Sequence, residues 1–262
     1  MNGVIIGKYL PGYSIWHKMD PRAKLIAVTL FIISCFLIGN WWFLITFFVI
    51  EIVGVLATRL PVTYFLKSLK PILFFVFLTV GLQMIFNNEG VVLFRLGFLS
   101  ITDAGLSLGF FMALRLVIVI LISAVLTLTT KPSDLTLALE ALFGPLRTIK
   151  FPVSEMALMI SIALRFVPTL FEETQKILKS QASRGVDISE GRLKDKVSQL
   201  VSLLVPLFVL SFKRAEDLAN AMEVRGYVPG KIRTSINLLK WQFKDSGLVF
   251  FSVILLILSI SF

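Results

Sequence analysis

The sequence has almost none of the residues that build metal centres and disulfide bonds. Its 262 residues include one cysteine, Cys35, and one histidine. A single cysteine excludes an internal disulfide, and one cysteine with one histidine cannot form a Cys/His metal cluster. We therefore expect no metal site in this chain.

Motifs of nucleotide chemistry are also missing. The sequence has no Gly-x-x-x-x-Gly-Lys-Ser/Thr loop for a nucleotide phosphate and no repeated acidic motif that would hold Mg²⁺. The acidic pairs Glu172-Glu173 and Glu216-Asp217 lie among basic residues, which is typical of a solvated helix face. We therefore predict no catalytic residues and no cofactor in this chain, and we do not expect it to be an enzyme.

Apolar side chains dominate the composition instead. Hydrophobic residues make up 56% of the sequence, including 24 Phe, whereas charged residues make up 16%. This exceeds what one soluble core of this size needs, so the composition indicates an integral membrane protein. The N-terminal segment lacks the basic start, apolar core and cleavage site of a signal peptide, and we expect it to be mature sequence.

Long uncharged runs predict five transmembrane helices, since a bilayer core about 30 Å thick needs roughly 20 apolar residues. The run Leu25–Ala57 is too long for one span and is interrupted at Gly39-Asn40-Trp41-Trp42, which favours a tight hairpin of two helices. Three other runs each predict one span: Phe65–Phe86, Ala104–Thr130 and Ser246–Phe262. The loop at residues 87–102 is expected to form a short hairpin or an interfacial cap.

Basic residues predict the orientation of these helices. With a cytoplasmic N-terminus, nearly all of the 26 Lys and Arg residues fall on the cytoplasmic side. Only Arg95 lies outside, and Arg115 lies within a span, in agreement with the positive-inside rule. Cytoplasmic loops therefore explain the net charge of +10, and no nucleic acid partner is expected.

Residues 151–226 contain two further apolar runs of about 16 residues, which are short for a membrane span. A transmembrane pair is the alternative here, but it would place a set of basic residues outside: Lys176, Lys179, Arg184, Arg192, Lys194 and Lys196. We favour two long cytoplasmic helices, at about 152–183 and 195–224, lying against the inner face of the membrane or another membrane protein.

The expected fold is therefore an all-α, polytopic membrane protein with about five transmembrane helices and a cytoplasmic region of long amphipathic helices. Residues 1–130 are expected to form a membrane domain with four transmembrane helices. Residues 131–243 are expected to form a cytoplasmic domain with the two long helices, and residues 244–262 the final transmembrane helix.

Both long helices are expected to end in the same dipeptide. Arg184-Gly185 follows the first helix and Arg225-Gly226 follows the second. Glycine after a helix is an ordinary C-cap, and arginine there suits the helix dipole. Because the ending recurs on two consecutive apolar helices, we interpret it as two similar tips for a partner with two similar sockets, such as a dimeric cytoplasmic ATPase. An arginine fork suits carboxylates and helix C-terminal carbonyls on that partner.

Each long helix also carries a proline near its middle, Pro168 in the first and Pro206 in the second. Proline inside a helix removes one hydrogen bond and usually kinks the axis. A static bend and a flexing point are both open interpretations of these kinks.

Two charges lie within the expected spans, Glu51 and Arg115. Charges at such positions are candidates for function by default. Helix rise places them at different depths, so a mutual ion pair is not favoured. Three interpretations are open: a satisfied structural role, a contact of Arg115 with a partner, and an ion path.

The segment GKYLPGYSIWHKMDPRAKL, from residue 7, resembles the opening of the transmembrane T component of energy-coupling factor (ECF) transporters, the EcfT or CbiQ-like family. Residues 137–187 resemble its cytoplasmic coupling region. The two Ala-Arg-Gly motifs of that family match Ser183-Arg184-Gly185 and Val224-Arg225-Gly226, with the first residue changed in both.

The resemblance implies a coupling subunit of a bacterial ABC-type importer in the cell membrane, for vitamins or related micronutrients. Two ATPase subunits, EcfA-like and EcfA′-like, would hydrolyse ATP with Mg²⁺ and bind the two motifs. A small membrane-embedded S component would bind substrate and contact the apolar halves of the coupling helices and the lipid bilayer. We expect these residues to face it: Met156, Met159, Ile160, Leu203, Leu204 and Leu207. The alternative is a stand-alone secondary transporter or channel, which would need clustered polar residues at mid-membrane.

Overall fold

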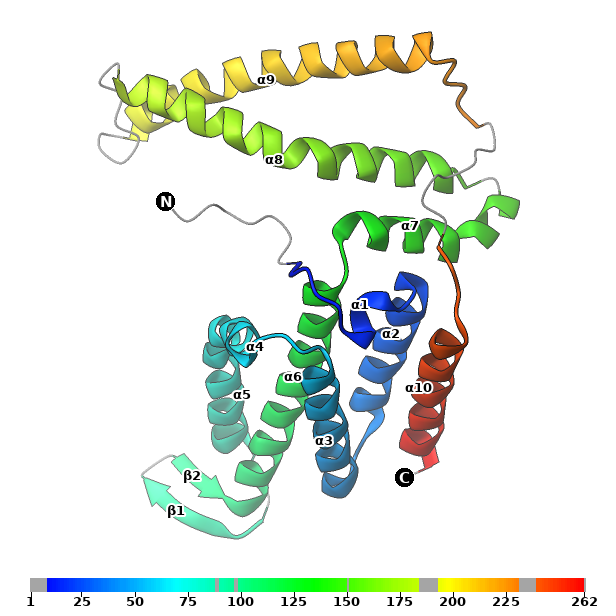
Figure 1. The fold of residues 1–262 in the computed structure, drawn as a ribbon. Helices are drawn as coiled ribbons and strands as arrows, with labels where there is room; N and C mark the ends of the chain where they lie inside the picture. The colour runs from blue at the N-terminus through cyan, green and yellow to red at the C-terminus, as the bar shows by residue number, and fades with distance from the viewer. Residues whose placement is uncertain are drawn as a thin grey trace. The chain divides into compact units, whose positions relative to one another are not determined.

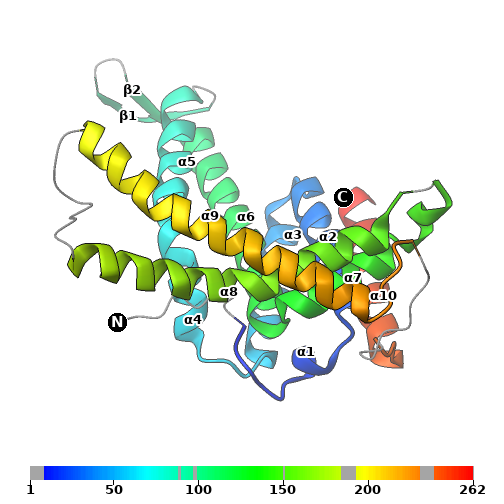
Figure 2. The same ribbon diagram turned by 90° about the horizontal axis from the view of Figure 1, so that it is seen from above.

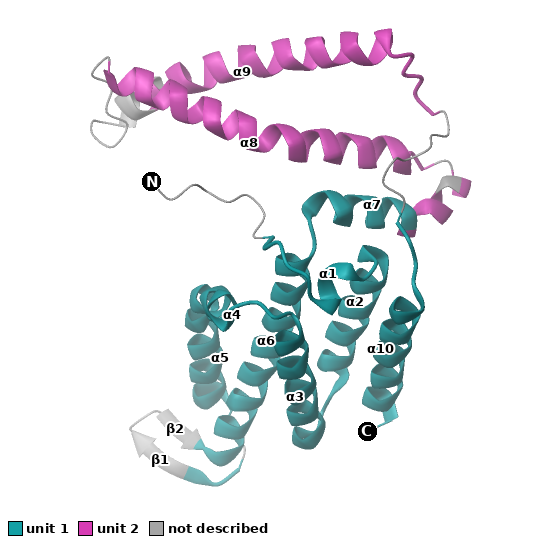
Figure 3. Ribbon diagram, in the orientation of Figure 1, with its two compact units in different colours: residues 1–141, 238–262 teal, residues 142–237 magenta. Residues whose placement is uncertain are grey.

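The computed structural model describes residues 9–87, 90–96, 99–149, 151–183, 193–230 and 239–261. The chain divides into two compact units, coloured separately in Figure 3. Unit 1 combines residues 1–141 with residues 238–262, and unit 2 is residues 142–237. Unit 2 is therefore inserted between two parts of unit 1 along the chain.

Helices make up most of the described chain (Figure 1). The elements of unit 1, in chain order, are α1 (Ile15–Lys18), α2 (Pro21–Leu37), α3 (Trp41–Ala57), α4 (Val62–Leu69), the 3₁₀ helix η1 (Lys70–Ile72), α5 (Leu73–Phe86), β1 (Val92–Leu96), β2 (Leu99–Thr102), α6 (Asp103–Thr129), α7 (Pro132–Leu142) and α10 (Phe243–Ser261). Unit 2 contains η2 (Gly144–Ile149), α8 (Val153–Ser183) and α9 (Leu193–Val224).

The predicted polytopic, all-α membrane architecture is confirmed. Within the described residues, four helical stretches are long and apolar enough to cross a membrane: Val62–Phe86, Asp103–Thr129, Val153–Ser183 and Phe243–Ser261. Helix α3 is a shorter apolar helix. Because α8 also meets this criterion of length and composition, its placement in the cytoplasm stays a prediction.

The break in the long N-terminal apolar run lies where the sequence predicts it. Helix α2 ends at Leu37 and α3 begins at Trp41, with Asn40 as N-cap accepting a hydrogen bond from the Trp42 amide at 3.2 Å. At the other end of α2, Asp20 is the N-cap and Pro21 is the first helical residue, a combination that suits a helix start.

The core of unit 1 lies between α2, α3, α6 and α10. Its largest cluster is built from apolar side chains of these helices: Val28, Phe31, Cys35, Ile38, Leu44, Phe47, Phe111, Ile118, Ile122 and Leu255. A second cluster joins α3 and α4 to the later part of α6: Val55, Phe65, Leu121, Ala124, Val125 and Leu128. Helix α6 thus contributes to both clusters and is the central helix of unit 1.

Helix α5 packs against α6 through glycines. A Cβ atom added at Gly109 would lie 3.3 Å from the Cα of Val80, and one at Gly105 would lie 3.0 Å from the carbonyl oxygen of Gln83. Small residues let helix backbones approach this closely in membranes. Other side chains of α5 are exposed, with Phe77 at 72% exposure.

The loop between α5 and α6 forms an antiparallel hairpin of β1 and β2, one of the two structures expected for it. The strands pair from Val92 opposite Thr102 to Leu96 opposite Leu99, with an irregularity between Val92 and Phe94. Thr102 then caps α6 by accepting a hydrogen bond from the Gly105 amide at 3.1 Å.

In unit 2, the two long helices lie close to their expected limits. Helices α8 and α9 run in opposite directions, and Figure 2 shows them crossing. Pro168 and Pro206 lie inside unbroken helices, and the kinks expected at these prolines stay a prediction.

Candidate functional site

The end of α9 is built as a Schellman cap, the commonest way to stop a helix with glycine. Gly226 has a φ of +72°, in the left-handed region. Its amide donates to the Glu223 carbonyl at 2.9 Å, and the Tyr227 amide donates to the Met222 carbonyl at 2.9 Å. These bonds satisfy the last carbonyls of α9 and fix the direction in which the chain leaves the helix. The capping role of Gly226 is therefore confirmed.

The residues beside this cap are open to solvent. Arg225 is exposed, and its guanidinium forms no ion pair with another described residue. Val224, directly before it, is an apolar side chain that is 88% exposed. Within the described residues, the tip of α9 thus offers an unpaired cation and an apolar contact on a capped helix end.

At the end of α8, the structure describes the first tip only up to Ser183. Ser183 is the last residue of α8, is exposed, and its hydroxyl donates to the Lys179 carbonyl at 3.0 Å. Arg184 and Gly185 lie outside the described residues. The equivalence of the two tips therefore stays a prediction from the repeated dipeptide.

The apolar halves of α8 and α9 carry exposed hydrophobic side chains. On α8, Met159 is 65% exposed, and Met156 and Ile160 are also exposed. On α9, Leu204 is 55% exposed, while Leu203 and Leu207 are half-buried. Surfaces of this kind, when they continue over several side chains, mark protein or membrane contacts.

An ion pair joins the two helices of unit 2. The Arg214 guanidinium on α9 donates to Oε1 of Glu173 on α8. Both side chains are partly shielded, with 31% of the Arg214 and 13% of the Glu173 side chain exposed. This pair explains Glu173, one of the acidic residues noted in the sequence, as a link between α8 and α9.

A second set of polar residues, which the sequence analysis did not identify, gathers where α2 and α10 begin. Asp245 is fully buried, and its carboxylate accepts hydrogen bonds from the Asp20 amide at 3.0 Å and the Gln242 amide at 2.7 Å. The Arg22 guanidinium donates to the Leu239 carbonyl at 3.0 Å and forms an ion pair with Asp20. We call these four residues the clasp: Asp20, Arg22, Gln242 and Asp245.

Lys24, just inside α2, extends this arrangement to α6. It is 1% exposed, and its ammonium donates to the Thr129 carbonyl at 3.3 Å and to the Thr130 hydroxyl at 3.0 Å. One feature of the sequence could have indicated these polar contacts. Two cations follow the Asp-Pro start in the first turn of an apolar helix, where cations oppose the helix dipole.

Arg115 has a structural environment in the described chain. Its guanidinium donates to the carbonyl of Ile38, the C-cap of α2, and lies 5.0 Å from the Phe111 ring centre and 5.8 Å from that of Phe36. A cation at a helix C-terminus is favourable. Arg115 therefore holds the end of α2 beside α6.

Glu51 is different, because its carboxylate has no such neighbour. It is 2% exposed, and its Oε1 has no hydrogen-bond partner among the described residues. Glu51 and Arg115 form no ion pair within the part of the chain that the structure describes. The two charges in the spans thus have separate surroundings, as their different depths predict.

No group of three or more His, Cys, Asp or Glu side chains is placed to hold a metal ion within the described ranges. The described residues offer an exposed cation on a capped helix end and apolar helix faces.

Comparison with known proteins gives consistent matches over the chain. The family model CbiQ, described as cobalt transport protein, matches residues 12–236. The energy-coupling factor transporter transmembrane protein EcfT of Bacillus subtilis (strain 168) is 47% identical over 257 residues, covering 97% of this chain and 96% of the relative. EcfT of Listeria innocua is 47% identical over 249 residues, covering 95% and 94%.

A third relative, EcfT of Lactococcus lactis subsp. cremoris, is 43% identical over 260 residues, covering 99% of this chain and 98% of the relative. These matches include both the membrane-spanning helices of unit 1 and the long helices of unit 2. They confirm the resemblance found in the opening segment and in the coupling region, and the chain therefore belongs to the CbiQ family.

Proposed function

We propose that this chain is the coupling subunit of an ECF-type importer, joining two cytoplasmic ABC-type ATPases to a membrane-embedded S component. The ATPases, EcfA-like and EcfA′-like, would hydrolyse ATP with Mg²⁺. The S component would bind the substrate, a vitamin or related micronutrient. This chain would transmit motion between them without catalysing a reaction itself.

The observation that carries the proposal is the α9 tip, with the exposed Arg225 directly before a Schellman cap. A capped helix end holds its last side chains in a defined direction, so Arg225 can meet an acidic or carbonyl-lined socket with little loss of conformational freedom. The second Arg-Gly dipeptide at Arg184-Gly185 supports a partner with two similar sockets. Ser183 and Val224 take the places next to the two arginines.

The exposed apolar side chains on α8 and α9 support a second, separate partner. Methionine and leucine repack easily, which suits a surface that must release one S component and accept another. We assign this contact to the six residues Met156, Met159, Ile160, Leu203, Leu204 and Leu207. The N-terminus and unit 2 are proposed to lie in the cytoplasm.

The test separates the two contacts by comparing three variants of the full chain expressed with its partners. In Arg184→Glu/Arg225→Glu, like charges meet at both sockets, and we expect the ATPases to be lost from the purified complex while the S component is retained. In Leu204→Asp, the reverse is expected. Each charge-assisted hydrogen bond lost from a tip contributes about 1.5 to 3 kcal/mol, so each single arginine variant should weaken the complex less than the double.

Lys213→Glu is the matched control, because Lys213 is an exposed cation on α9 away from the tip. It should leave both partners and substrate uptake unchanged. Gly226→Val tests the cap without removing the arginine, since a β-branched residue resists positive φ. Normal uptake and retained ATPases in the double arginine variant would show that the tips are helix caps only, and would overturn the proposed docking.

A further inference from the structure

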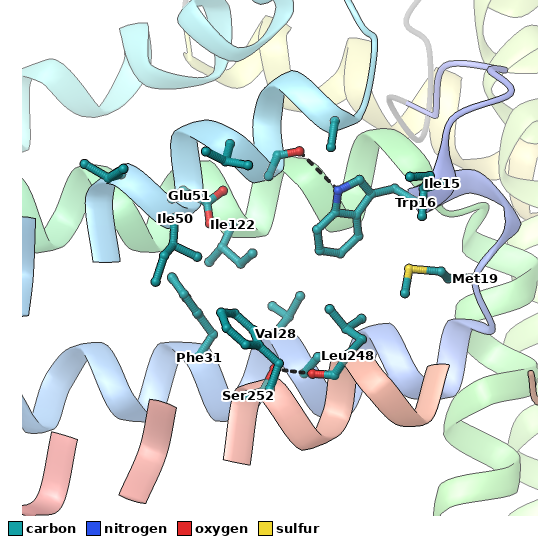
Figure 4. Close-up of a pocket in the computed structure, with 16 residues that line it drawn as sticks. Ile15, Trp16, Met19, Val28, Phe31, Ile50, Glu51, Ile122, Leu248 and Ser252 are labelled. Carbon is teal, nitrogen blue, oxygen red and sulfur yellow. Dashed lines mark hydrogen bonds between the residues drawn. The ribbon is translucent and has the colours of Figure 1, made fainter. Parts of the chain in front are cut away.

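Unit 1 contains a crevice of about 420 Å³ between α3 and α10. Figure 4 shows Val28 and Phe31 of α2 and Leu248 and Ser252 of α10 on one side, and Glu51 and Ile50 of α3 on the other. The walls are almost entirely apolar, and among the described residues that line them Glu51 is the only ionisable one. The crevice therefore suits a hydrocarbon chain.

A second hollow of about 390 Å³ adjoins the crevice, because Ile15 and Met19 line both. The remaining residues that line the second hollow are polar, aromatic or basic: Tyr13, Lys18, Gln242 and Lys244. Figure 4 shows Ile15 and Met19 together at one end of the crevice, away from Glu51. The two cavities together have an apolar end and a basic end.

The basic end has two cations that the described chain does not neutralise. Lys18 and Lys244 are both exposed, and neither forms an ion pair with a described residue. The nearby carboxylates are turned into the protein: Asp245 accepts two backbone hydrogen bonds, and Asp20 caps α2 and pairs with Arg22. The hollow thus presents positive charge to its surroundings.

Aromatic side chains place this end at the membrane surface. Tyr13 is 93% exposed and Trp241 is 46% exposed, both close in sequence to the two lysines. The Trp16 indole lines the crevice and donates to the Gly54 carbonyl at 3.1 Å. Tyrosine and tryptophan are enriched at the level of lipid headgroups. These aromatic residues favour a position at headgroup level for the basic hollow, with the crevice deeper.

Glu51 supplies an independent sign that the crevice has an occupant. Its Oε1 atom is buried and has no hydrogen-bond partner among the described residues, and burying such an atom is costly. Helix rise places Glu51 about 9 Å from the end of α3 at Ala57, below the level of the aromatic residues. A hydrogen-bonding group of an occupant at this depth would give the Oε1 atom of Glu51 the partner it lacks.

We propose that these two cavities form a binding site for one anionic phospholipid, with its phosphate between Lys18 and Lys244 and an acyl chain between α3 and α10. Basic pockets beside transmembrane helices favour anionic headgroups, whereas neutral lipids gain nothing from the two lysines. The site lies wholly within unit 1 and does not depend on the proposed coupling function.

Trp16 can report on the occupant directly. In a chain with Trp41→Phe, Trp42→Phe and Trp241→Phe, Trp16 is the sole tryptophan, and its fluorescence is quenched by a lipid with brominated acyl chains in the crevice. The full chain is reconstituted in vesicles that contain equal fractions of either brominated phosphatidylglycerol or brominated phosphatidylcholine. We expect phosphatidylglycerol to bind with about a fivefold higher apparent affinity for each lysine, and hence to quench more strongly at low mole fraction.

Lys18→Gln/Lys244→Gln in the same background should abolish the preference for phosphatidylglycerol. The matched control is Lys67→Gln/Lys70→Gln, which removes the same charge from exposed positions on α4 and η1 and should leave the preference intact. Val53→Phe, at the exposed part of the crevice wall, should reduce quenching by both lipids. Equal quenching by the two lipids would mean that Trp16 contacts the surrounding lipid without a specific site, and would overturn the proposal. If only the control variant lost the preference for phosphatidylglycerol, general surface charge would explain that preference. This result would also overturn the proposal.

A second measurement uses the chain with all four tryptophans, so that the conclusion does not depend on the tryptophan substitutions. The melting temperature in neutral detergent should rise with added phosphatidylglycerol and not with phosphatidylcholine, because a ligand that binds only the folded chain stabilises it. The rise should disappear in Lys18→Gln/Lys244→Gln. An equal rise in that variant would contradict the site.

Discussion

Lys24 shows how a single buried cation can be stable inside an apolar helix bundle. At the start of α2 its charge opposes the dipole of its own helix. Its ammonium instead reaches the C-terminal end of α6, where the Thr129 carbonyl and the Thr130 hydroxyl accept its hydrogen bonds. The unfavourable position in one helix is thus offset by the favourable position beside another, and α2 and α6 are held at a fixed register.

We therefore predict that Lys24→Met destabilises unit 1 by about 1 to 3 kcal/mol, because the α6 carbonyl is left buried without a donor. The measurement is the melting temperature of the purified chain in detergent. Lys67→Met, at an exposed position, is the matched control and should change little. Similar losses in both variants would mean that the Lys24 bonds contribute nothing specific.

At the scale of elements, the packing of α5 against α6 depends on glycines, which let the two helix backbones approach closely. Gly105 and Gly109 lie four residues apart on α6, facing the backbone of α5 at Gln83 and Val80. Helices in a bilayer gain little from burying apolar surface, so close backbone contact is what holds a peripheral helix in place. Gly81, on α5, has no atom within 4 Å of the place where a Cβ would lie.

Gly109→Leu should force α5 away from α6 and cost about 1 to 3 kcal/mol, as overpacking usually does. Gly81→Leu removes a glycine from a helix at a site with open space, so it should be neutral or slightly stabilising. Thermal unfolding of the two variants in the same detergent checks this difference. If the order of stability were reversed, the glycine contact would not be what joins the helices.

Much of the element pattern was predictable from hydrophobic runs and their interruptions. The hairpin of α2 and α3, helix α6, and both long helices of unit 2 have limits within a few residues of the prediction. The short helices α1 and α7 were not predicted, because they are too short to show a period. The clasp was missed for another reason, since the contact of Asp20 with Asp245 joins residues 225 positions apart, which no local pattern encodes.

The part of the candidate site that carries the repeated Arg-Gly dipeptide was predictable from the sequence. Gly226 adopts the capping geometry that its dipeptide predicts, and Arg225 beside it is exposed. Glu51 and Arg115 could be recognised as charges within spans, but their different surroundings could not. Arg115 finds a carbonyl partner because the end of α2 lies beside α6. Which helices become neighbours decides whether such a charge has a partner, and the sequence does not show this.

At the scale of the whole molecule, the distribution of cations predicts which side of the membrane each segment faces. Unit 2 is rich in lysine and arginine, whereas the hairpin of β1 and β2 carries one cation, Arg95. Such asymmetry favours a cytoplasmic unit 2. The apolar length of α8 makes this a prediction that needs a direct experiment.

In a chain with Cys35→Ser, we expect Lys179→Cys and Asp195→Cys to resist a membrane-impermeant thiol reagent in intact cells and to react after the cells are opened. Arg95→Cys is the matched control and should react from outside in intact cells. Labelling of Lys179→Cys from outside would show that α8 and α9 cross the membrane as a pair.

The clasp can form only near the end of chain synthesis. Unit 1 consists of two segments separated by the whole of unit 2, and α10 leaves the ribosome after both α8 and α9. Until then the Asp20 amide and the Arg22 guanidinium have neither Asp245 nor the Leu239 carbonyl to bind. Before α10 is made, the first helices therefore lack these contacts, and the bundle of unit 1 is incomplete.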